Sequence, residues 1–155
     1  REILGTCSVA QGVEDLRLEA RVAPSAPPRA SLDSFRIVQA VANLVENAVK
    51  FTPKGGRVEI EVAGRDEIEI AGQEETEAGG EGGVLCISVS DTGVGIAPEN
   101  IDHLFDRFWQ GKRTDRRGAG LGLNIVRGIA EAHGGCVKVE SRLHQGTRFT
   151  LELPL

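Results

Sequence analysis

The chain contains no methionine and begins at Arg1, so we expect it to be a piece of a longer protein. No apolar run approaches the roughly 18 residues needed to span a bilayer, and no signal peptide is visible. The three cysteines, Cys7, Cys86 and Cys136, are an odd number without metal-ligand spacing. We therefore expect a soluble segment of a reducing compartment, with Cys86 and Cys136 as buried free thiols in strands.

The net charge of the chain is −5, and its negative charge is concentrated in one segment. Between Asp66 and Gly83 there are seven acidic residues and no Lys or Arg, so this run carries more negative charge than the whole chain. An acidic, glycine-rich run is typical of a solvated loop, and we expect a flexible loop at residues 64–83. The remainder is close to neutral without a large basic face, which argues against nucleic-acid binding.

At 155 residues the chain is long enough to bury its own core as one domain, with an entry strand and a proline-rich link in residues 1–32. Alternation of apolar and polar residues predicts strands at Leu16–Val22, Arg57–Val62, Val84–Val89, Cys136–Ser141 and Thr147–Leu153. Helical spacing and capping residues predict helices from Asp33 or Ser34 to Phe51, around Asn100–Phe108, and from Gly120 to His133. Together they predict an α/β fold, a two-layer sandwich of a mixed sheet with helices on one face.

The first helix places polar side chains beside its apolar stripe. The stripe, which should face the sheet, consists of Ile37, Val41, Leu44 and Ala48. Asn47, Asn43, Lys50 and Gln39 form the neighbouring polar row, with Asn47 closest to the buried edge. An amide oxygen there is a reasonable Mg²⁺ ligand, and Lys50 can neutralise phosphate charge. The alternative is an ordinary amphipathic helix with solvated asparagines.

Asp91 ends an apolar strand and enters a turn that contains Gly93 and Gly95. A carboxylate at this point can accept a hydrogen bond from the amino group of adenine and would disfavour the carbonyl of guanine. The two glycines allow the backbone to approach a flat base closely. The alternative is a plain Asp-Thr-Gly turn between two elements.

Gly118, Gly120 and Gly122 precede the last predicted helix, so free backbone amides there can hold an anion. The chain has neither the G-x-G-x-x-G spacing after a strand nor the G-x-x-x-x-G-K-[ST] motif, which excludes the dinucleotide-binding and P-loop classes. Before the glycines come the cations Lys112, Arg113, Arg116 and Arg117. They could close over a triphosphate as a lid or form a solvated basic loop.

These motifs, in this order, resemble the catalytic ATP-binding domain of sensor histidine kinases, in the superfamily that includes gyrase, the heat-shock chaperones and the mismatch-repair ATPases. The asparagine, first glycine, phenylalanine and second glycine boxes of that family are matched by Gln39–Thr52, Asp91–Ile96, Leu104–Trp109 and Gly118–Leu123, followed by Gly134–Gly135 and Gly146–Thr147. The resemblance implies a Bergerat-type α/β sandwich with about five strands, and an ATP lid at 97–119. The lid is short, so which of its cations would meet the γ-phosphate stays open.

The resemblance implies ATP and Mg²⁺ as ligands, with Asn47 holding the metal. Catalytic roles fall on Asn43, Lys50, Arg116 and Arg117. The nucleotide would contact Asn47, Phe51, Asp91, Gly93, Gly95, Ile96, Gly118, Gly120, Leu121, Gly122, Leu123 and Thr147.

Three functions fit this pattern: phosphoryl transfer to a histidine, transfer to serine as in anti-sigma-factor kinases, and ATP hydrolysis. Hydrolytic relatives carry a glutamate one turn before the metal asparagine, where this chain has Asn43, which cannot act as a base. Glu46 points about 100° away from Asn47 on a helix. We therefore expect a histidine kinase domain.

None of the histidines, His103, His133 and His144, lies in the family's acceptor pattern. The expected partners are therefore a dimerisation and histidine-phosphotransfer domain of the same protein and a response-regulator receiver domain. The resemblance implies a cytoplasmic domain of a membrane-anchored sensor, and we expect the fragment itself to be monomeric.

Overall fold

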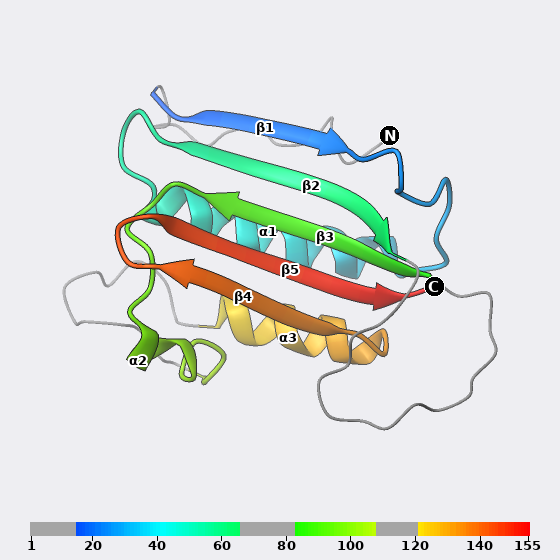
Figure 1. Ribbon diagram of the computed structural model, residues 1–155. Helices are drawn as coiled ribbons and strands as arrows, with labels where there is room; N and C mark the ends of the chain where they lie inside the picture. The colour runs from blue at the N-terminus through cyan, green and yellow to red at the C-terminus, as the bar shows by residue number, and fades with distance from the viewer. Residues whose placement is uncertain (1–14, 66–82, 108–120) are drawn as a thin grey trace.

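The computed structural model describes residues 15–65, 83–107 and 121–155. Five strands form one sheet in the order β1-β2-β3-β5-β4, and the helices lie on one of its faces (Figure 1). The elements are β1 (Arg17–Val22), α1 (Ser34–Phe51), β2 (Arg57–Arg65), β3 (Val84–Asp91), α2 (Pro98–Ile101), α3 (Gly122–Ala132), β4 (Cys136–Arg142) and β5 (Gly146–Pro154). The predicted α/β sandwich with a mixed sheet is confirmed. None of the helices in the described ranges is long and apolar enough to cross a bilayer.

Helix α1 begins and ends where its sequence predicts. Asp33 is the N-cap, and its Oδ1 accepts a hydrogen bond from the backbone N–H of Arg36 at 3.1 Å. At the other end the hydroxyl of Thr52 donates to the carbonyl of Ala48 at 2.6 Å, just before Pro53. All four members of the predicted apolar stripe are buried: Ile37, Val41, Leu44 and Ala48.

The sheet is antiparallel except at β1, which pairs with β2 in parallel. Alternate residues of the strands face the helices and form the core with α1 and α3. The buried members on the three central strands are Val58, Ile60, Leu85, Ile87, Val89, Phe149, Leu151 and Leu153. This core holds α1 and α3 side by side over the sheet.

Most strand boundaries and those of α3 differ from the prediction by one or two residues, and β2, the short helix α2 and the burial of β1 differ more. Strand β2 extends to Arg65, because Gly64 and Arg65 continue the ladder opposite Leu85 and Val84. The short helix is confined to Pro98–Ile101 and is followed by turns, and α3 starts at Gly122. Strand β1 forms as predicted, but its Val22 is 63% exposed because β1 is an edge strand.

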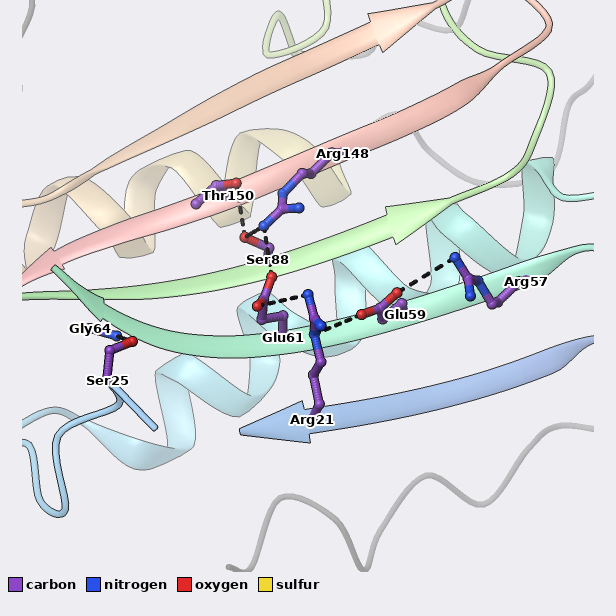
Figure 2. A network of polar contacts seen from close by, with 9 residues as sticks. All are labelled: Arg21, Ser25, Arg57, Glu59, Glu61, Gly64, Ser88, Arg148 and Thr150. Carbon is purple, nitrogen blue, oxygen red and sulfur yellow. Dashed lines mark hydrogen bonds and ion pairs between the residues drawn. The ribbon is translucent and has the colours of Figure 1, made fainter. Parts of the chain in front are cut away.

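The face of the sheet opposite the helices carries charged side chains rather than a second apolar layer (Figure 2). Arg21 of β1 forms ion pairs of 2.9 Å with both Glu59 and Glu61 of β2. Glu61 also pairs with Arg148 of β5 at 2.9 Å, and Arg148 donates to the hydroxyl of Ser88 on β3. The ion pairs therefore cross the sheet from β1 to β5.

The cysteines Cys86 and Cys136 lie on this same face, on either side of Glu152. Both are free thiols, as expected, but they are half-buried rather than buried, because the helices of the described residues all lie on the other face (Figure 1). Burial still raises the pKa of each thiol. Glu152 itself is 4% exposed and is neutralised by Arg65 at 3.0 Å and Lys138 at 3.2 Å.

His133 connects the end of α3 to the start of α1. Its Nε2 accepts a hydrogen bond from the backbone N–H of Asp33 at 3.2 Å, and its Nδ1 lies 2.7 Å from the carbonyl of Ile129. Because Nε2 accepts, the proton of the neutral ring lies on Nδ1 and is donated to Ile129. One imidazole thus satisfies backbone groups of both helices.

Replacing His133 with leucine should lower the free energy of unfolding by about 1–2 kcal/mol, because the N–H of Asp33 loses its acceptor and the carbonyl of Ile129 keeps only the backbone N–H of residue 133 as a donor. Urea denaturation at pH 7 measures this change. The matched control is His103→Leu, whose exposed ring bonds only to the exposed Asp106 and which should change stability by less than about 0.5 kcal/mol. Equal losses in the two variants would contradict the bridging role of His133.

Candidate functional site

The predicted site residues that the structure describes meet where α1, the end of β3 and the start of α3 come together. A Cβ atom built on Gly122 would lie 3.4 Å from Oδ1 of Asn43, so the backbone at the start of α3 touches the middle of α1. A Cβ atom built on Gly93 would lie 2.5 Å from the carbonyl oxygen of Phe51. Two contacts therefore bring residues that are far apart in the sequence to the same side of α1.

The polar row on α1 lies at the rim of the core, as predicted. Asn43, Asn47 and Lys50 are half-buried, next to the fully buried Leu44. The ammonium group of Lys50 lies 5.0 Å from the centroid of the Phe51 ring, a distance typical of a cation–π contact. Phe51 is 42% exposed and offers an aromatic surface at the end of the helix.

Asp91 is held in place by backbone amides. The N–H of Gly93 donates to its Oδ1 at 2.8 Å, and the amide of Thr147, its partner across the β3–β5 ladder, also donates to the carboxylate. Desolvation by burial nevertheless raises the pKa of Asp91 above its ordinary value of 3.8, and these two hydrogen bonds oppose part of the rise. The half-buried carboxylate of Asp91 is thus fixed in orientation.

The turn after Asp91 is clamped to the hairpin between β4 and β5. The backbone N–H of His144 donates to the carbonyl of Val94 at 2.7 Å, and the N–H of Ile96 donates to Oγ of Ser141 at 2.8 Å. Gly95 has a φ of +70°, and a side chain there would collide with the carbonyl of Arg142. The turn requires glycine for both reasons.

Ser141 and His144 were not predicted as site residues. His144 acts through its backbone, in the left-handed region with φ of 63°, which its residue type does not signal. Ser141 lies near the end of β4, in line with the apolar Val137 and Val139, and precedes the Gly146–Thr147 pair. Its position before this pair could have marked Ser141 as a site residue, but the sequence does not show which turn the serine would contact.

Helix α3 presents its N-terminus to the site. Leu121 is its N-cap and makes no side-chain capping bond, so the amides of the first turn, which includes Gly122 and Leu123, are the groups available to an anion. The preceding candidates Gly118, Gly120, Arg116 and Arg117 lie outside the described residues.

The phenylalanine box is described only for its first members. Leu104 is buried in the core, and Phe105 meets Phe149 edge-on at 6.5 Å between ring centroids. The side-chain amide of Asn124 on α3 donates to the carbonyl of Phe105 at 3.1 Å. Core packing therefore accounts for Leu104 and Phe105, and Phe108 and Trp109 lie outside the described residues.

The donor atoms in the described part of the chain do not form a metal cage, since no group of three or more His, Cys, Asp and Glu residues converges there. The half-buried amide of Asn47 suits a hard cation that takes its other ligands from phosphate and water. A hollow of about 370 Å³ lies on the opposite face of the sheet, around Cys86 and Glu152, and contains none of the predicted site residues.

Residues 32–155 match the family described as histidine kinase-, DNA gyrase B- and HSP90-like ATPase. The histidine protein kinase DivJ of Caulobacter vibrioides is 40% identical over 136 residues, 86% of this chain and 20% of the relative. The sensor histidine kinase RppB of Synechocystis sp. is 37% identical over 123 residues, 77% of this chain and 24% of the relative. The chain thus spans about a quarter or less of the length of these relatives.

Two solved structures are similar over most of this chain. The mycobacterial sensor histidine kinase MprB superposes with a TM-score of 0.69 at 29% identity, covering 92% of this chain and 83% of that chain. Full-length ShkA in complex with AMPPNP superposes with a TM-score of 0.65 at 32% identity, covering 89% of this chain and 25% of that chain.

Replacing Asp91 with asparagine should stabilise the fold at pH 7. Because the pKa of Asp91 is raised by folding, its ionised form destabilises the folded state at pH values above the folded-state pKa. Asparagine removes that charge while its oxygen can still accept from Gly93, although the loss of a carboxylate oxygen for the amide of Thr147 reduces the gain. The stability gain should shrink as the pH falls through the raised pKa and vanish below about 3.8, the ordinary value.

Thermal unfolding of both proteins between pH 3 and pH 8 measures this difference. The exposed Asp102 provides the control, since Asp102→Asn should change the stability little at any pH. A loss of stability in Asp91→Asn that grows toward neutral pH would show that the ionised carboxylate stabilises the fold instead.

Proposed function

The chain belongs to the family of histidine kinase-, DNA gyrase B- and HSP90-like ATPases, and from this premise we propose that it binds Mg-ATP and donates the γ-phosphoryl group to a histidine of a partner domain. In the full-length sensor kinase that partner would be the dimerisation and histidine-phosphotransfer domain, which passes the phosphoryl group to a response-regulator receiver. The domain would then work on the cytoplasmic side of a membrane-anchored sensor.

The observation that carries the proposal is the meeting of three separate segments at one side of α1. Asn43 touches the start of α3, while Phe51 touches the turn that contains Gly93. Asp91 lies in that turn with its carboxylate held by two amides. The polar face of α1 suits a metal ion and phosphate charge, and the N-terminus of α3 suits phosphate oxygens. The anchored carboxylate suits the amino group of adenine. The similarity to ShkA, solved with AMPPNP, supports an adenine nucleotide in this place.

Asn47 would hold Mg²⁺ through its side-chain oxygen. The ion keeps several waters and takes phosphate oxygens, so one protein ligand is sufficient and the absence of a carboxylate cluster in the described residues is consistent with it. When bound, Mg²⁺ supplies charge neutralisation for the triphosphate. Lys50, half-buried one turn beyond Asn47, would add a positive charge on the same side of the helix.

Among the residues that the structure describes, α1 places no group that could activate water on the nucleotide side of the site. Asn43, at the contact with α3, is an amide and cannot accept a proton from water. Glu46 is exposed, on a different face of α1. A histidine acceptor is already nucleophilic near neutral pH, so phosphoryl transfer to imidazole needs positioning and charge neutralisation rather than a base. Asn43 and Lys50 would provide these, together with the lid cations Arg116 and Arg117.

The histidines of this chain are committed to other contacts in the described structure. His133 bridges two helices, His103 pairs with Asp106, and the backbone of His144 holds the glycine turn. The acceptor would therefore belong to another domain. A serine acceptor, as in anti-sigma-factor kinases, and a superfamily ATPase remain the alternatives, and the chemistry of the phosphorylated product separates them.

Replacing Asn47 with alanine should weaken the binding of ATP by about tenfold or more in the presence of Mg²⁺, as expected for the loss of a metal contact. Without Mg²⁺ the variant and the parent should bind ATP alike. Isothermal titration calorimetry measures both conditions. Glu46→Ala on the exposed face of the same helix is the control and should retain the parent affinity, and equal affinities for Asn47→Ala and the parent in Mg²⁺ would remove Asn47 from the site.

Mixing the chain with the dimerising helical domain of its full-length protein and γ-labelled ATP should transfer label to that domain. Phosphohistidine is labile in acid and stable in base, whereas phosphoserine shows the reverse stability. Label that is lost in acid and kept in base supports the proposed histidine kinase. Label that is kept in acid and lost in base supports the serine kinase. Rapid release of phosphate by the isolated chain, without labelled protein, would identify an ATPase.

A further inference from the structure

Asp91, Thr147 and Ser141 lie in one row across three neighbouring strands. The ladders pair Asp91 of β3 with Thr147 of β5, and Thr147 with Ser141 of β4. In the next row of the same face Val89, Phe149 and Val139 pack into the core beneath the helices. Since side chains two residues apart share a face, the three polar side chains point to the helix side, where the proposed nucleotide site lies.

The contacts of the Ser141 hydroxyl determine which group donates in each hydrogen bond. Its Oγ lies 3.0 Å from the carbonyl of Gly146, to which only the serine can donate. Its single proton is thereby used. The same oxygen accepts from the N–H of Ile96 at 2.8 Å and lies 2.8 Å from Oγ1 of Thr147. To satisfy all three contacts, the hydroxyl of Thr147 must donate its proton to Ser141.

We propose that Ser141 is a positioning residue that sets the base specificity of the site by holding the Thr147 hydroxyl as a hydrogen-bond acceptor. Thr147 is 7% exposed and stands between Ser141 and Asp91, so solvent does not randomise its hydroxyl. With its proton turned toward Ser141, Thr147 presents only lone pairs to the side of Asp91. The site then offers two neighbouring acceptors, one charged and one neutral.

This inference rests on the proposed binding of ATP. Two acceptors complement the 6-amino group of adenine, which is a donor, and repel the 6-oxo group of hypoxanthine or guanine. If Ser141 is removed, the Thr147 hydroxyl can turn its proton outward and donate to a carbonyl. Discrimination between the two purine classes would then rest on Asp91 alone.

The test measures the dissociation constants of ATP and ITP, in excess Mg²⁺, for the 155-residue chain and its variants by calorimetry. Ser141→Ala should reduce the preference for ATP over ITP by about three- to tenfold, the equivalent of one hydrogen bond. Ser141→Thr keeps the hydroxyl and should restore the preference. The matched control is Ser88→Ala, because Ser88 shares a hydroxyl contact of 3.0 Å with Thr150 on the helix-free face and should leave the ratio unchanged.

A double-mutant cycle with Thr147→Val assigns the effect to the hydroxyl pair. In the Thr147→Val background, Ser141→Ala should not alter the ratio further. If Ser141→Ala weakens ATP and ITP equally, or still changes the ratio without the Thr147 hydroxyl, the inference is overturned while the proposed function stands. If the folded parent chain binds neither nucleotide, the proposed function itself fails.

Discussion

Burial of the apolar stripe of α1 against the sheet determines where every other part of the site can be. Leu44 and Ala48 are buried in the core, so the polar row of the same helix is placed at its rim. The end of β3 and the start of α3 then reach that rim from two sides, through Gly93 and Gly122. The contact at Gly93 leaves no room for a Cβ atom, whereas a Cβ atom on Gly122 would make an ordinary van der Waals contact with Asn43.

The two faces of the sheet follow different physical rules. The face under the helices is apolar and excludes water, whereas the other face is crossed by ion pairs from Arg21 to Arg148 (Figure 2). The partly exposed pairs each add little stability, but a face of alternating charge is soluble and does not attract a second sheet. On the same face the carboxylate of Glu152 is buried, and it pairs with two cations, Arg65 and Lys138, as a buried carboxylate requires.

Much of the fold could be predicted from the sequence because it depends on local periodicity. The stripe on α1 and the alternation in β3 and β5 specify both the element type and the buried face. The exposure of Val22 could not be predicted, because a strand sequence does not reveal whether the strand lies at an edge. In the site, Asn43 and Asp91 were recognisable by residue type and order, but Ser141 acts through hydrogen bonds to segments distant in the sequence, and local periodicity says nothing about these. The roles of the site residues in nucleotide binding remain predictions.

The edge position of β1 affects how the molecule opens. This strand is joined to the sheet along one side only, by its parallel ladder to β2 and the ion pairs of Arg21, and most of its side chains are exposed. Segments with few buried contacts open at a small fraction of the global unfolding free energy. Amide protons of β1 should therefore exchange with deuterium well before those of β3 and β5. A tension applied to the chain ahead of Arg17 would peel β1 away while leaving the contacts of α1 with β3 and α3 intact.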